Sequence, residues 1–189
     1  MKKFAILLLL ALELAVCGCG SSTLADKTIN TATSGNWEAQ LTGGTDQASL
    51  LNFITVFDLT NAGTLDIRGF NFFNQGACFG NTVNGVAGSS ETGSASFTTN
   101  TATDQVTGQL SFTVTSITPP GNVLTLTTPA GGLTGTSNGT TTTTGTLTNG
   151  IAVGSWTLTG GAGDPSCTGG GSFLMCQNPT SNGTCPPPP

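Results

Sequence analysis

Histidine and tyrosine are both absent from this chain of 189 residues, and only four residues are lysine or arginine. Without histidine the sequence lacks the usual general base and any Ser–His or Cys–His nucleophile pair. Nine acidic residues give a net charge of −5, so there is no basic patch for nucleic acid or for anionic headgroups. We therefore expect no catalytic residue, metal, cofactor or nucleic-acid partner.

A carboxylate pair is the one catalytic arrangement that the composition leaves open. Asp58 and Asp66 flank an expected turn, with Arg68 close by. Because glycosidases need only two carboxyl groups, a carboxylate-dependent hydrolase is one alternative. An ion pair at a surface loop is the interpretation that we favour. Calcium binding is not indicated, since no D-x-D-x-D-G loop is present.

The N-terminus has the pattern of a targeting signal. Lys2 and Lys3 precede an apolar run of 13 residues, Phe4 to Val16, which only Glu13 interrupts. That length suits a secretory signal and is too short to cross a bilayer, which takes about 20 apolar residues.

The residues after this run resemble the lipobox of bacterial lipoproteins, in which a Gly or Ala precedes the cysteine that is lipidated. Gly18 precedes Cys19, whereas Val16 precedes Cys17. Lipidation of Cys19 also leaves four later cysteines, an even number that an oxidising compartment favours. The resemblance implies cleavage before Cys19, with Cys17 as the alternative acceptor. An ordinary secretory signal or a CxC metal site remains open as well.

This resemblance implies a location in the cell envelope. Each buried CH₂ of an acyl chain contributes about 0.8 kcal/mol, so two or more chains hold a protein on the membrane. Gly20 follows Cys19, in place of the Asp that commonly retains lipoproteins on an inner membrane. The implied partner is thus the outer membrane, to which the lipid anchor holds the protein on an extracytoplasmic side.

Alternation of apolar and polar residues predicts strands throughout the rest of the chain. Val106 to Val114 is the clearest case, with Thr, Gln and Ser on the opposite face. Tight turns such as Pro119-Pro120-Gly121-Asn122, Asn138-Gly139 and Asn149-Gly150 separate these runs. The expected strands cover 37–42, 53–59, 65–69, 95–99, 106–114, 123–127, 133–137, 140–148, 151–159 and 170–177. We predict an all-β antiparallel meander, a small β-barrel or barrel-like sandwich of roughly eight to ten strands.

The domain organisation follows from these segments. Residues 1–18 are the expected signal peptide, and 19–34 comprise the lipidated cysteine and a polar tether. Residues 35–177 form one β domain, and 178–189 are a Pro-rich tail.

Two G-x-W triplets add a second resemblance. Gly35-Asn36-Trp37 is similar to the first strand of lipocalin- and avidin-type barrels, where the Trp lies across one barrel end, and Gly154-Ser155-Trp156 repeats the triplet. The late basic residue of lipocalins and the pocket tyrosines of the avidin type are both missing. The resemblance implies a barrel shape and a core position for Trp37. Both Trp37 and Trp156 are candidates for core or ligand-contact aromatics.

The four remaining cysteines can pair in three ways. A strand from Gly170 to Cys176 would carry Cys176 roughly 20 Å along the sheet, too far for a bond to Cys167. We favour Cys78–Cys167 with Cys176–Cys185, because the turn residues before Cys185 let the tail fold back.

Three functions are compatible with these features. The first is a membrane-anchored lipoprotein acting as a structural or surface-interaction domain without catalysis. The second is a barrel-type binding module for a small neutral or apolar ligand. The third is the carboxylate-dependent hydrolase. A filled interior would favour the first and a polar cavity the second.

Overall fold

The part of the chain that the structure describes folds into a single antiparallel sheet of nine strands. The computed structural model describes residues 35–43, 51–60, 62–73, 77–80, 87–137, 147–162, 164 and 166–177, and no α-helix occurs in these ranges. The strands are β1 (Asn36–Thr42), β2 (Phe53–Leu59), β3 (Leu65–Phe72), β4 (Ser89–Asn100), β5 (Gln105–Ser116), β6 (Val123–Thr127), β7 (Leu133–Ser137), β8 (Leu147–Thr159) and β9 (Gly169–Gln177). The predicted all-β antiparallel fold is confirmed.

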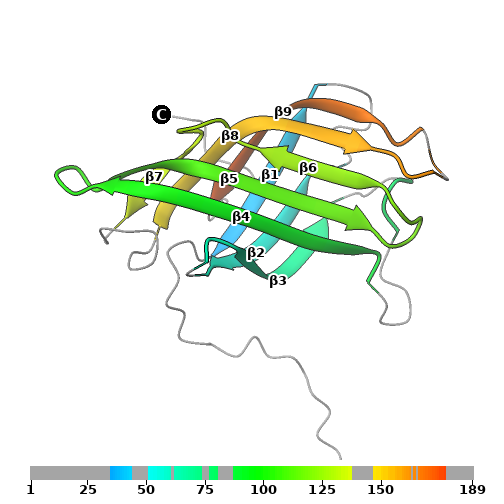
Figure 1. Ribbon diagram of the computed structural model, residues 1–189, viewed down its shortest axis with the longest axis horizontal. Coiled ribbons are helices and arrows are strands. Elements are labelled where there is room, and N and C mark those ends of the chain that lie inside the picture. Colours follow the sequence, from blue (N-terminus) through cyan, green and yellow to red (C-terminus); the bar gives the residue numbers. More distant parts are fainter. Residues whose placement is uncertain are drawn as a thin grey trace, which may run out of the picture.

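The sheet curls until its two ends meet, which makes it barrel-like (Figure 1). Its strand order is β3-β2-β1-β9-β8-β6-β5-β4, so the first and last strands pair and the edges are β3 and β4. In the picture β1, β2 and β3 cross behind β4, β5 and β6. The two edges join at one bridge, Thr64 to Ser94, where the Ala95 N–H donates to the Gly63 carbonyl at 3.0 Å. β1 and β9 therefore close the barrel through a full ladder, whereas the edges at β3 and β4 are joined through this bridge.

β6 and β7 together act as one interrupted strand. Both lie between β5 and β8: β6 pairs with Ser111–Thr115 and β7 with Gln105–Gly108. Between them residues 128–132 leave the sheet, and Gly131 has a φ of 76°, which suits glycine. This excursion places small residues on the outside of the barrel, beside β5.

Asn149-Gly150 was expected to be a hairpin turn, and this prediction is wrong. The two residues lie inside the continuous strand β8. The β7–β8 register shifts between Thr134 and Thr136, and Asn149 has a φ of 53°. A β-bulge can require a positive φ, as a hairpin turn does. The Asn-Gly pair therefore predicted the backbone conformation of Asn149 correctly, but that conformation belongs to a bulge and not to a turn. Most of the expected strand 140–148 lies outside the described residues.

Both tryptophans are buried in the core. Trp37 is fully buried and stacks on Phe57, with ring centroids 5.3 Å apart. A Cβ at Gly150 would overlap the Trp37 ring, which explains a glycine at the bulge. Trp156 is 1% exposed, and its Nε1–H donates to the Thr42 carbonyl at 3.1 Å. Around them, one cluster of buried Phe and Leu side chains occupies the inside of the barrel.

A short segment plugs the barrel end near the start of β9. Cys78 and Phe79 are buried there, and the Phe79 ring lies 4.9 Å from that of Phe72. A disulfide joins Cys78 to Cys167, with Cα atoms 5.7 Å apart. Asn122 ties the same loops together: its Nδ2 donates to the Cys78 carbonyl at 2.8 Å, and its Oδ1 accepts from the Gly161 N–H at 2.7 Å.

Replacing Asn122 with Ala is expected to destabilise the protein by about 2–3 kcal/mol, because a buried carbonyl and a partly buried N–H lose their partners. Urea unfolding followed by tryptophan fluorescence measures the change. Asn100→Ala is the matched control, since Asn100 is exposed and its Oδ1 caps only a local turn through the Ala102 N–H. An equal effect of the two variants would contradict the proposed role of Asn122.

Candidate functional site

Hydroxyl side chains form rows across the outside of the barrel. The register places Ser94 of β4, Ser111 of β5 and Thr127 of β6 opposite one another. The same row continues through Ser155 of β8 and Ser172 of β9 to Thr42 of β1. A second row runs parallel to it. We call these two rows the hydroxyl face: Thr42, Thr92, Ser94, Ser111, Thr113, Thr125, Thr127, Ser155, Thr157 and Ser172.

Strand geometry makes this face a regular array. Neighbouring strands lie about 4.7–4.9 Å apart, and alternate residues of one strand lie about 6.7 Å apart. In Figure 1 the strands β9, β8, β6, β5 and β4, which carry most of the face, lie side by side at the front. Their inward positions, such as Phe112 and Leu126, are fully buried. The alternation that builds the core therefore also builds the hydroxyl face.

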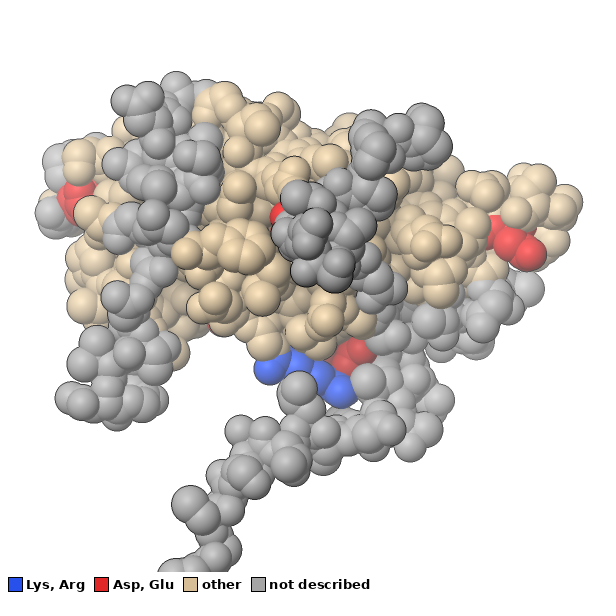
Figure 2. All heavy atoms as spheres, turned by 180° about the vertical axis from the view of Figure 1, so that it is seen from behind, with Lys and Arg blue, Asp and Glu red and all other residues tan. Residues whose placement is uncertain are grey.

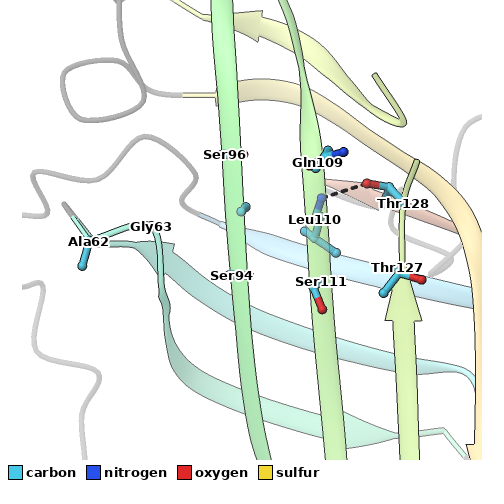
Figure 3. Close-up of a pocket in the computed structure, with 10 residues that line it drawn as sticks. Ala62, Gly63, Ser94, Ser96, Gln109, Leu110, Ser111, Thr127 and Thr128 are labelled. Atoms are coloured by element: carbon cyan, nitrogen blue, oxygen red, sulfur yellow. Dashed lines mark hydrogen bonds between the residues drawn. The ribbon is translucent and has the colours of Figure 1, made fainter. Parts of the chain in front are cut away.

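The hydroxyl face is hollowed where it crosses β4, β5 and β6 (Figure 3). The hollow has a volume of about 430 Å³. Gln109 and Ser111 of β5 lie between the serines of β4 and the end of β6, and the turn at Ala62–Gly63 forms one wall. The Thr128 hydroxyl accepts a hydrogen bond from the Leu110 N–H at 2.8 Å, which anchors the other wall.

A second hollow of about 410 Å³ continues the first along the same strands. Both are lined by Ser96 and Gln109, and the second ends at Ala130–Gly131 in the excursion between β6 and β7. None of the described residues that line either hollow is charged. We call the two together the outer groove. It offers hydroxyl and amide groups to a ligand, with small residues at its margins.

Asp58, Asp66 and Arg68 form an ion-pair cluster, as expected, but not at a loop. Arg68 lies in a register shift between β2 and β3, and its Nη2 is 2.6 Å from Asp58 Oδ2. Its Nε is 3.7 Å from Asp66 Oδ2. The Asp58 side chain is only 2% exposed, so the expectation of a surface loop was wrong. In Figure 2 a blue patch lies against red atoms, and most of the described surface in this view is tan. The guanidinium contacts both carboxylates. In a glycosidase the two carboxyl groups flank the substrate instead.

The predicted cysteines divide into two groups. The Cys78–Cys167 disulfide is present as expected. Cys176 is disulfide-bonded too, but Cys185, its predicted partner, lies outside the described residues, so that bond stays a prediction. Cys19 and the alternative Cys17 also lie outside the described residues.

Comparison of the chain with protein-family models, with curated proteins and with solved structures found no match. Within the described ranges, no helix is long and apolar enough to cross a membrane. The same ranges contain no group of three or more His, Cys, Asp or Glu residues placed to hold a metal ion.

Sequence reasoning missed the outer groove and the role of Asn122. Polar residues on one face of β5 were recognised, but their alignment with those of β4, β6 and β8 depends on the register between strands. Asn122 was recognised only as a turn residue. A buried hydrogen-bonding role has no local sequence signal, because Cys78 and Gly161 are far from it in the chain.

Proposed function

We propose that this protein is a lipoprotein anchored through Cys19 in the cell envelope, where its β domain serves as a surface-interaction domain without catalysis. The lipobox resemblance supports the anchor, and the outer membrane is the proposed location. The hydroxyl face supports an interaction role, because it is an extended, exposed and uncharged polar surface on the outside of the barrel.

The filled interior is the observation that carries this proposal over a lipocalin-like alternative. An internal binding site of that type needs a cavity of several hundred Å³. Here Trp37, Phe53, Phe57 and Phe112 pack against one another inside the barrel, with ring centroids 5.3–6.4 Å apart. The groove that is available lies on the outside. Binding to the outer surface is thus better supported than binding inside.

Inhibiting the lipoprotein signal peptidase with globomycin is expected to leave an unprocessed precursor that still carries residues 1–18. Mass spectrometry of the untreated protein should find acyl chains on an N-terminal Cys19. Cys19→Ser should release the protein from the membrane fraction, whereas Cys17→Ser should leave it anchored. An unmodified N-terminus beyond Cys19 would contradict the proposed anchor, and loss of anchoring in Cys17→Ser alone would move it to Cys17.

A further inference from the structure

We propose that the outer groove binds a segment of a neutral glycan. This inference rests on the surface-interaction function proposed above and names the class of its ligand. The first argument for such a ligand is the chemistry of the side chains that line the groove. Throughout the described part of the chain, the side chains of Ser96, Gln109 and Ser111 make no hydrogen bond, so their donors and acceptors are available.

The described residues of the lining carry no charge, which favours a neutral partner. A glycan presents hydroxyl groups that both donate and accept, which matches serine, threonine and glutamine side chains. Among the described residues of the lining, an anionic polymer would meet no cation. Arg68 of β3 lies outside this lining and is paired with Asp58 and Asp66.

The floor of the groove argues against an extended peptide. Peptides commonly add to a free sheet edge, where backbone groups are unpaired. Here β5 lies in the middle of the sheet, paired with β4 on one side and with β6 and β7 on the other. The backbone groups of β5 are used in these ladders and, at Leu110, in hydrogen bonds to Thr128, so β5 offers side chains alone. The free edge of the sheet at this place is that of β4, at the margin of the groove.

The shape of the outer groove suits a chain of sugar rings. A volume of about 430 Å³ lies within the range of about 300–1,000 Å³ typical of ligand sites. The second hollow extends it in one direction, through Ser96 and Gln109. Ala62, Gly63, Ala130 and Gly131 at the margins leave room for the C–H faces of the rings. A shallow polar groove predicts weak binding, on the order of 1 mM for one segment, strengthened by repetition along a polymer.

Native gel electrophoresis of the full chain, purified in detergent, provides the test. Gels contain dextran, hydroxyethylcellulose or, for comparison, anionic alginate. At least one neutral polymer should retard the protein, and alginate should not. Ser96→Ala/Gln109→Ala should weaken retardation about tenfold or more, since two hydrogen-bonding side chains are lost. Thr159→Ala, exposed on β8 outside the groove, is the matched control and should bind as the unmodified protein does.

Amide NMR of the same preparation with the retarding polymer, or with N-acetylglucosamine tetramer if neither retards it, locates the site. The side-chain amide of Gln109 should shift, while that of Gln177, buried at the end of β9, should not. Absence of both retardation and shifts, unchanged binding by the double variant, or equal retardation by alginate would each overturn the proposal. Mass spectrometry of the same sample reports acylation, so a failed anchor and a failed groove are distinguished.

Discussion

Replacing Trp37 with Ala is expected to lower the free energy of unfolding by about 3–5 kcal/mol. Its side chain is fully buried, stacks on Phe57 and lies against Gly150 of the β8 bulge. Removing the indole leaves a cavity between β1 and β8 that small neighbours cannot fill. Because whole domains are typically stable by about 5–15 kcal/mol, this is a large fraction of the total.

Urea unfolding measured by circular dichroism tests this expectation, with Phe73→Ala as the matched control. Phe73 is an aromatic residue of similar size next to β3, but it is 53% exposed. Its loss should cost less than about 1 kcal/mol. A similarly small effect at Trp37 would show that the indole is not part of the core, and a ligand-contact role would then become the better hypothesis.

Removing the Cys78–Cys167 disulfide in a Cys78→Ala/Cys167→Ala variant is expected to cost about 4–5 kcal/mol in the chain-entropy model. The bond closes a long loop, since the two cysteines are 89 residues apart, and it restricts the unfolded chain accordingly. Replacing both cysteines avoids leaving a free thiol. It also leaves the bond of Cys176 in place, which a chemical reductant would not.

Combining this double variant with Asn122→Ala tests whether the disulfide and Asn122 secure the same segment. Both hold Cys78 at the plugged end of the barrel, one through its sulfur and the other through its carbonyl. The combined loss of stability should therefore be smaller than the sum of the separate losses. Strict additivity would mean that the two contacts act independently, and a loss below about 1 kcal/mol for the cysteine variant would refute its stabilising role.

Most strands could be predicted because their signal is local. β5 shows it best: Val106, Leu110, Phe112 and Val114 all point inward, as their alternation indicated. Asn149-Gly150 shows the limit of such signals. A turn and a bulge require the same backbone conformation at Asn149, and only the pairing of β8 with both β7 and β9 shows that the strand continues.

The candidate site could not be predicted, because it depends on contacts between distant segments. Ala62, Ser96, Gln109 and Thr128 come from four separate parts of the chain, and no spacing in the sequence connects them. The ion-pair cluster could be predicted in part. Asp58, Asp66 and Arg68 are close in sequence and were expected to interact, but the burial of Asp58 follows from its place in the folded sheet.

The amino-acid sequence alone specifies which residues face inward and which face outward, since a strand alternates its side chains with a period of two. It also determined the class of fold and indicated the Cys78–Cys167 bond. Tertiary structure alone decided that β1 closes against β9, that β6 and β7 share the space between β5 and β8, and that hydroxyls on six strands align into a row. The physical reason is register: alternation is set within each strand, whereas alignment is set by which strands meet and at what offset.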